Sequence, residues 1–146
     1  MSDSPELTRL LPIAAPTCHN RRILLFALRR IAAHGLDDAH AAHAMIGWFG
    51  LGFRRPLILL RALMSEMSRV SARKIVVAPC CCNRMTATEA GILSAVDSAI
   101  RDPQGAHDML SDLLGVKHCL GALGSAQALS QAFEDLGHPF EREELH

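Results

Sequence analysis

Residues 74–100 have the sequence KIVVAPCCCNRMTATEAGILSAVDSAI. The β-branched run at residues 75–77 favours a short buried strand, which a proline ends just ahead of three consecutive cysteines. Thr86 and Glu89 then have the spacing of a capping box, which predicts the first turn of a helix. The apolar stripe of that helix comprises Ile92, Leu93, Val96 and Ile100. The sequence therefore predicts that residues 80–82 lie in a loop between a strand and a helix.

Five further segments have the spacing of amphipathic helices, with apolar residues three or four positions apart and a capping or stop residue near one end. They cover residues 20–34, 37–48, 56–70, 103–114 and 125–136. Asn20, Asp37 and Ser125 are the predicted N-caps, and Trp48 is predicted to be a buried core anchor. With the helix after Thr86, these segments predict a mainly α, single-domain bundle of about six helices.

The two ends of the chain differ from this helical part. Prolines interrupt the first twenty residues, which show no sustained apolar period. We therefore expect a flexible N-terminal arm at residues 1–20, a single helical domain at residues 21–140 and an acidic tail at residues 141–146.

A second strand is predicted between the last two helices. Residues 116–119 are short and tolerate β-structure, so we expect that they could pair with residues 74–78 in a small two-stranded patch. This pairing, suggested by composition alone, would bring His118 and Cys119 beside the three consecutive cysteines.

Composition indicates one soluble domain. The chain has 146 residues, of which 49% are hydrophobic, and a chain of that length buries about two-thirds of its unfolded surface, so it needs no disulfide for stability. The 5 cysteines are an odd number, and the opening residues lack a secretory signal. We therefore expect a reducing, cytoplasmic location. The most apolar stretches are too short to span a membrane, so no membrane association is expected.

Charge is divided unequally along the chain, although the formal net charge is +0. Residues 1–75 contain 11 Lys/Arg and 5 Asp/Glu, a net of +6, whereas residues 76–146 contain 4 and 10, a net of −6. This polarity could attract an anionic partner, or it could draw the two halves together within one fold. The intramolecular interpretation is favoured, because nucleic-acid binders usually carry a net basic excess.

Two arginine pairs stand at predicted helix starts, where the helix dipole disfavours cations. They are Arg21 with Arg22 and Arg54 with Arg55. An anion would relieve this conflict, and it could be phosphate, an acidic partner or the acidic half of the same chain. Internal ion pairs are the favoured interpretation, and contact with phosphate or nucleic acid is the alternative. For the chain as a whole, a protein partner or a second copy is possible, and nucleic acid is possible but not favoured.

The consecutive cysteines suggest a soft-metal site. In an extended segment Cys80 and Cys82 point to one side and Cys81 to the other, so the first two could bind one ion. Tetrahedral zinc needs about four ligands and copper(I) accepts fewer. The additional candidate donors are Cys119 with His118 and Cys18 with His19. The spacing matches no paired CxxC zinc motif, so folding must bring these donors together.

The favoured function is accordingly a non-enzymatic thiol protein that binds zinc or copper(I) as a sensor, carrier or regulatory adaptor. A redox switch or thiol enzyme is the first alternative. Its candidate nucleophile is Cys82, which lies near a helix start and Arg84. Against an enzyme, the residues adjoining the cysteines include no His, Asp or Glu before Glu89. A protein- or nucleic-acid-interaction module with arginine-rich helix faces is the second alternative.

Two segments carry a family resemblance. They are FRRPL at residues 53–57 and APCCCNRMT at residues 78–86. With them the chain resembles a small family of uncharacterised alphaproteobacterial proteins that share an arginine-proline helix start and a triple-cysteine loop. The resemblance extends from about residue 21 over most of the chain. It implies a single bacterial domain and brings no activity, cofactor or partner.

Overall fold

A computed structural model of the chain describes residues 11, 13–79 and 82–140. Within these residues there are six α-helices, one 3-10 turn (η1) and two short strands. The helices are α2 (His19–His34), α3 (Ala39–Phe49), α4 (Arg54–Val70), α5 (Ala87–Ser98), α6 (Pro103–Leu114) and α7 (Leu120–Asp135). The turn η1 is Gly50–Gly52, and the strands are β1 (Ile13–Ala14) and β2 (Arg84–Met85). The predicted mainly α, six-helix domain is confirmed.

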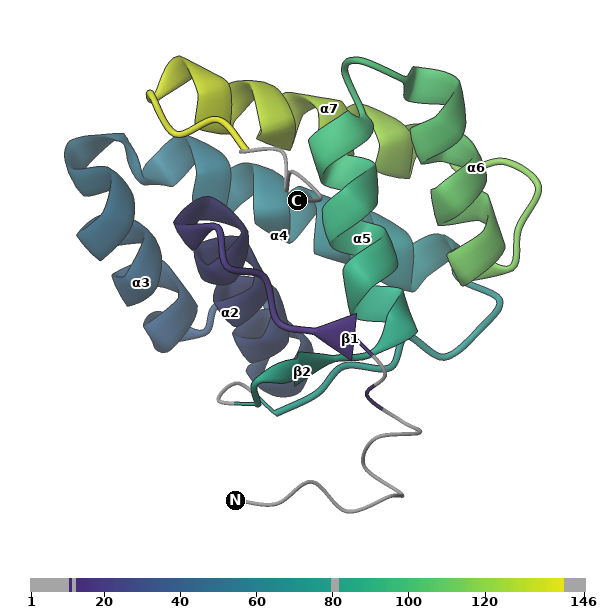
Figure 1. The fold of residues 1–146 in the computed structure, drawn as a ribbon, viewed down its shortest axis with the longest axis horizontal. Helices are drawn as coiled ribbons and strands as arrows, with labels where there is room; N and C mark the ends of the chain where they lie inside the picture. Colours follow the sequence, from purple (N-terminus) through teal and green to yellow (C-terminus); the bar gives the residue numbers. More distant parts are fainter. Residues whose placement is uncertain (1–10, 12, 80–81, 141–146) are drawn as a thin grey trace.

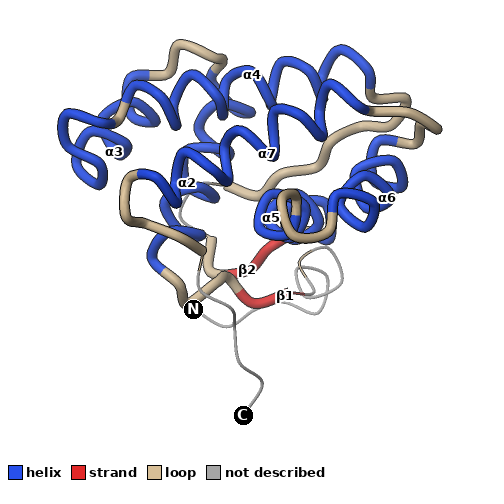
Figure 2. The backbone as a smooth tube through the Cα atoms, turned by 90° about the horizontal axis from the view of Figure 1, so that it is seen from above, coloured by secondary structure: helices blue, strands red, loops and turns tan. Residues whose placement is uncertain are grey.

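Helices α4 and α7 lie along each other, and α7 runs along the upper edge of the molecule in Figure 1. Figure 2 shows α2 and α3 on one side of this pair and α5 and α6 on the other. The core between them is aliphatic, and each fully buried Leu or Ile stabilises the fold by about 1.5–3 kcal/mol relative to an exposed one. Its fully buried members include Leu24, Leu28, Leu60, Leu63, Met67, Ile92, Leu110, Leu114, Leu129 and Phe133.

A two-stranded sheet is present, but the predicted location of its strands is wrong. Strand β1 pairs antiparallel with β2, with Ile13 opposite Met85 and Ala14 opposite Arg84. Residues 74–78 and 116–119 form no ladder. Side chains take the place of a partner strand beside residues 74–78, because the Thr86 hydroxyl donates to the Val76 carbonyl at 2.8 Å. The β-branched run is thus held by the capping residue of α5.

The N-terminal boundary lies earlier than residue 21. Helix α2 begins at His19, with Cys18 in the N-cap position and Asn20 in the first turn. Leu11 and Cys18 are buried, and β1 lies between them in the chain. The later part of the predicted arm is therefore packed against the domain. Residues 1–10 and 141–146 lie outside the described residues.

Two predicted helix caps are corrected. The N-cap of α3 is Asp38 and not Asp37, because the Asp38 carboxylate accepts a hydrogen bond from the Ala41 N–H at 2.9 Å. Helix α7 begins at Leu120, so Ser125 lies inside it. Ala122 is fully buried and extends the apolar stripe of α7 by one turn, which is why the helix starts before the predicted cap. The capping box of Thr86 and Glu89 is present as predicted.

Trp48 is half-buried and is not the core anchor that the sequence predicts. Its indole ring lies 5.8 Å from the imidazole of His19 and 5.2 Å from that of His138, measured between centroids. The indole N–H donates to the Asn20 side-chain carbonyl at 2.7 Å, and the Asn20 amide donates to the Pro139 carbonyl at 2.8 Å. Trp48 therefore joins α2, α3 and the segment that follows α7.

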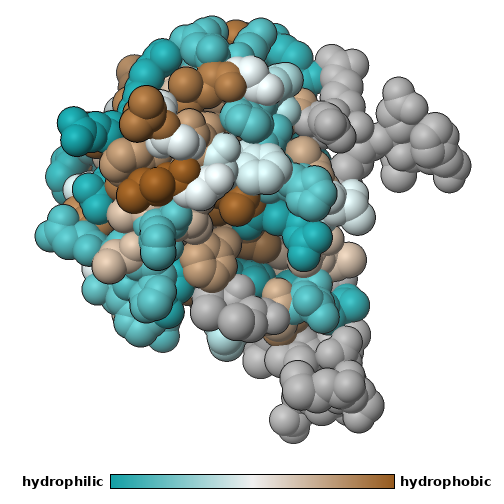
Figure 3. Space-filling model, turned by 90° about the vertical axis from the view of Figure 1, so that its left-hand side faces the viewer, coloured by the Kyte–Doolittle hydropathy of each residue, from teal (hydrophilic) through white to brown (hydrophobic). Residues whose placement is uncertain are grey.

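The α3 side of the molecule faces the viewer in Figure 3, where apolar side chains gather on part of the surface. Exposed apolar residues of α3, η1 and α4 include Ile46, Leu51 and Ile58, and Leu51 is fully exposed. The described part of the chain contains no membrane-spanning helix, because no helix there is both long enough and apolar enough to cross a bilayer.

Candidate functional site around the cysteine loop

A buried ion pair lies beneath the cysteine-containing segment. Arg29 comes from α2 and Glu89 from the first turn of α5, and their side chains are 2% and 0% exposed. The Arg29 Nε donates to Glu89 Oε2 at 2.6 Å, and Nη2 donates to Oε1 at 3.1 Å. This bidentate pair is called the clamp below. Its charges are matched and its hydrogen bonds are well formed, which a buried pair requires.

The clamp holds the backbone on both sides of the cysteines. Arg29 donates through Nη1 to the Cys82 carbonyl at 2.9 Å and through Nη2 to the Arg84 carbonyl at 2.7 Å. Glu89 accepts from the N–H of Ala78 at 3.2 Å. The same carboxylate also accepts from the Thr86 N–H at 2.9 Å, which is its part in the capping box. One ion pair therefore ties Ala78, Cys82, Arg84 and Thr86 to α2 and α5.

The N-terminal segment provides a second attachment. The Ala15 N–H donates to the Asn83 carbonyl at 2.8 Å, and the Arg84 guanidinium donates to the Leu11 carbonyl at 2.6 Å. Together with the pairing of β1 and β2, these bonds place Leu11 and residues 13–15 along the segment that follows the cysteines. The arm predicted from the prolines thus has a structural role at its C-terminal end.

The cysteine loop is defined here as residues 79–83. The Cys82 N–H donates to the Pro79 carbonyl at 3.1 Å, which joins the fourth residue of this loop to the first. Cys82 is half-buried and has a free thiol. A surface cavity of about 190 Å³ adjoins it, and Arg22, Arg29 and Asn83 contribute to its lining. Cys80 and Cys81, the other predicted ligands of the triplet, lie outside the described residues.

Cys119 has a separate environment. It is 3% exposed and precedes the first turn of α7. Its sulfur lies 3.5 Å from the Ser111 hydroxyl and 3.7 Å from the His107 carbonyl, to which the thiol donates. Its backbone N–H donates to the His107 Nε2 at 3.3 Å. The thiol is therefore directed into α6 and is hydrogen-bonded there.

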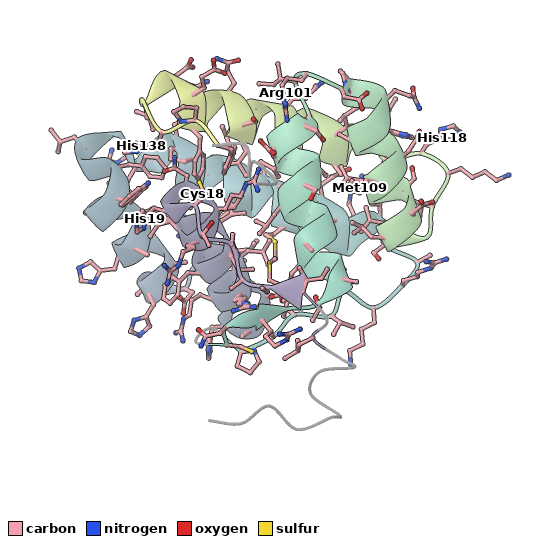
Figure 4. The ribbon with its side chains drawn as sticks, viewed as in Figure 1. Cys18, His19, Arg101, Met109, His118 and His138 are labelled. Atoms are coloured by element: carbon pink, nitrogen blue, oxygen red, sulfur yellow. The ribbon has the colours of Figure 1, made fainter. Side chains whose placement is uncertain are left out.

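The remaining predicted donors are far apart. Figure 4 shows Cys18, His19 and His138 on the side of α2 and α3, and His118 at the opposite side of the molecule. Cys18 is buried, whereas His19 and His118 are exposed. Among residues 11, 13–79 and 82–140, no three His, Cys, Asp or Glu side chains are grouped so that they could hold a metal ion. The described structure brings neither His118 and Cys119 nor Cys18 and His19 together with Cys82 in such a group.

The four predicted anion-binding arginines divide into two kinds. Arg21 and Arg55 pair with Asp97 and Asp135, at 2.6 and 2.7 Å. The Arg55 hydrogen bond is the main reason why the pKa of the Asp135 carboxyl is below its ordinary value. With the clamp, these pairs connect the basic half of the chain to the acidic half.

The other two arginines, Arg22 and Arg54, are exposed. Arg22 lines the cavity beside Cys82, and the Arg54 guanidinium lies 6.0 Å from the centroid of the Phe53 ring. Within the described part of the chain, neither forms an ion pair with an acidic residue.

Arg29 and His107 are the residues of this region that the sequence prediction missed. Arg29 carries a signal, because it lies four positions after Leu25 and one after Leu28, on the apolar face of its helix. A charged residue there requires a buried partner. His107 carries no such signal, since it lies twelve positions before Cys119 in a helix with a mixed surface.

A family model described as "Family of unknown function (DUF6628)" matches residues 1–139, and the chain belongs to this family. No curated protein and no solved structure shows significant similarity to the chain.

Proposed function

We propose that this member of a family of unknown function is a non-enzymatic thiol protein whose cysteine loop binds a soft metal ion in the reducing cytoplasm. The role would be that of a carrier or sensor. The observation that carries the proposal is the clamp, which fixes the backbone on both sides of three consecutive thiols. A metal site needs donors that the surrounding structure holds in position, and a hydrogen-bonded outer shell supplies this.

Charge supports the same proposal. Thiolates bind the metal in their deprotonated form, so a copper(I) ion with two thiolates has a net charge of −1. Arg29 donates to the carbonyl of Cys82, and Arg22 lines the cavity beside it. Glu89 neutralises the first of these cations, and the second is available to compensate an anionic complex.

The environments of the other cysteines narrow the choice of metal. Cys119 is hydrogen-bonded inside α6, and Cys18 is buried at the start of α2. The triplet therefore supplies the thiolates by itself, at most three from one chain. Two or three thiolates satisfy copper(I), whereas zinc would need a further ligand. We accordingly propose copper(I) ahead of zinc.

Native mass spectrometry under reducing conditions tests this function. The protein is purified without a metal-affinity tag, loaded with copper(I) or zinc, and compared with a Cys80→Ser, Cys82→Ser double variant. A Cys18→Ser, Cys119→Ser variant is the matched control, with folding checked by circular dichroism. We expect one copper(I) per chain in the wild type and in the control and none in the triplet variant. Unchanged stoichiometry in the triplet variant would refute the metal site.

A thiol-based redox switch is the second candidate, favoured by the partial exposure of Cys82 beside a cavity with two arginines. It predicts a metal-free protein in which Cys82 reacts fast with an alkylating reagent and forms a reversible disulfide or sulfenic acid under mild oxidation. We rank an arginine-based interaction module below both, because Arg21 and Arg55 are engaged within the fold.

A further inference from the structure

The cavity beside Cys82 has three chemically different walls. Its described lining includes two arginines, Arg22 and Arg29, and the apolar residues Leu25 and Phe26. Cys82 and Asn83 line it as well. Its volume of about 190 Å³ is small, and at ~30 Å³ for each water-sized group it holds a ligand of about six non-hydrogen atoms.

The two arginines of this cavity are not equivalent. Arg29 is buried, and its nitrogens are used by Glu89 and by the carbonyls of Cys82 and Arg84. Arg22 is exposed, and its side chain forms no hydrogen bond or ion pair with the rest of the described chain. It also lies in the first turn of α2, where the helix dipole disfavours a cation and favours an anion. Arg22 is therefore the group that a ligand can bind.

Carboxylate is the anion that best fits such an arginine in a cavity of this size, because the planar guanidinium binds it through two parallel hydrogen bonds. The apolar wall suits a short hydrocarbon chain, and a ligand sulfur beside Cys82 could share a soft metal ion with that residue's thiolate. We infer that this cavity binds a small mercaptocarboxylate, with its carboxylate on Arg22 and its sulfur toward Cys82.

This inference deepens the proposed function, on which it rests for its biological role. A small anionic thiol that holds copper(I) would deliver the ion to the cysteine loop by ligand exchange. Each protein thiolate that adds to copper replaces one thiolate of the donor, and the proton lost by the protein thiol is taken up by the departing thiolate. Copper stays in the +1 state, so the transfer needs neither an oxidant nor a reductant.

Binding of 3-mercaptopropionate to the reduced, metal-free protein, followed by isothermal titration calorimetry, tests the site. Arg22→Gln should weaken this binding about 10-fold or more, the usual effect of losing one charge-assisted hydrogen-bonded pair. Arg101→Gln is the matched control, since this exposed arginine lies just beyond the C-terminal end of α5, and it should leave the affinity unchanged (Figure 4). The neutral thiol 2-mercaptoethanol should bind much more weakly. Equal affinity of the wild type and Arg22→Gln would overturn the inference.

Rates of copper(I) transfer separate this inference from the proposed function. Transfer from the 3-mercaptopropionate complex should be faster than from the 2-mercaptoethanol complex, and Arg22→Gln should abolish the difference. If the wild type takes up copper(I) equally fast from both complexes and Arg22→Gln has no effect, the inference fails while the metal site stands. If binding of 3-mercaptopropionate depends on Arg22 but the Cys80→Ser, Cys82→Ser variant still takes up copper(I), the cavity stands and the proposed metal site fails.

Discussion

Cys82 and Cys119 are both free thiols that precede a helix in the chain, but their exposure and their contacts differ. Cys82 is half-buried in a loop at the surface, and a cavity with two arginines adjoins it. Cys119 is 3% exposed, and its sulfur contacts Ser111 and the His107 carbonyl. The first thiol is accessible to ligands, whereas the second is part of the core.

This difference shows that a thiol beside a histidine in the sequence is weak evidence for a metal ligand. His118 precedes Cys119 and is exposed, so the two side chains face different environments. The histidine that contacts Cys119 is His107, on the preceding helix. Hydrogen bonding and burial, and not the neighbouring residue type, separate a structural cysteine from a reactive one.

The largest expected effect concerns the clamp that positions Cys82. Glu89→Gln leaves Arg29 buried without a counter-charge, and we expect the free energy of unfolding to fall by about 3–5 kcal/mol. Urea denaturation measures this change. Asp135→Asn is the control, because the Arg55 pair that it breaks is about half exposed, and it should cost far less. A loss of stability for Asp135→Asn as large as that for Glu89→Gln would show that the buried clamp contributes no more stability than an exposed ion pair.

The next effect is the difference in labelling rate between the two thiols. In a Cys18→Ser, Cys80→Ser, Cys81→Ser background, iodoacetamide should modify Cys82 about 100-fold faster than Cys119, because a buried thiol reacts only after local opening. Peptide mass spectrometry at successive times gives both rates in one sample. Similar rates would mean that Cys119 is as accessible as Cys82, which would contradict the assignment of Cys119 to the core.

Replacement of the same two cysteines should affect stability in the opposite order: the thiol that reacts more slowly, Cys119, should matter more for stability. Cys119→Ala removes a buried sulfur and its contacts with α6, so we expect a loss of about 1 kcal/mol. Cys82→Ala changes a half-buried loop residue whose backbone bonds remain, and its effect should stay within about 0.5 kcal/mol. Thermal and urea unfolding of the two variants measure both values. A larger loss for Cys82→Ala would indicate that its side chain is structural.

The smallest expected effect concerns the ion pair of Arg30, the residue that follows Arg29 in α2. Arg30 donates two hydrogen bonds to Asp38, and mainly for this reason the pKa of the Asp38 carboxyl falls from 3.8 to about 2. A folded-state pKa below the unfolded value contributes stability that is present above the unfolded value and is lost as pH falls through the folded one. The stability difference between the wild type and Asp38→Asn should therefore be constant above about pH 5 and should shrink between pH 4 and pH 2.

Urea denaturation across this pH range gives the measurement. A difference that persists unchanged at pH 2 would show that the charge of Asp38 does not contribute.

Features encoded by neighbouring residues could be predicted from the sequence. The capping box at Thr86, the proline start of α6 and the glycine stop at Gly115 each depend on residues within one turn, and all three are present. Gly115 has a φ of 69°, the left-handed conformation that ends a helix with little strain for this residue. Local chemistry thus specified most of the helices.

Features that depend on contacts between distant residues could not be predicted from the sequence. Glu89 was predicted as a helix cap, but its second partner, Arg29, lies 60 positions away. The sequence predicted a partner strand at residues 116–119. The observed partner of β2 is β1, which comes from the proline-rich first part of the chain. Strand pairs of two residues leave too little pattern to identify a partner. The candidate site depends on these long-range contacts, so the sequence indicated its cysteines and not its surroundings.

The clamp also sets the order in which the chain can fold during its synthesis. Arg29 is made 60 residues before Glu89, an interval of about 3–12 s at ~5–20 residues per second. Until then Arg29 lacks the carboxylate with which it is buried in the folded chain. The three cysteines, in contrast, are added just before Glu89. Translation therefore exposes the arginine for a long time and the thiols for a short one before their anchor is available.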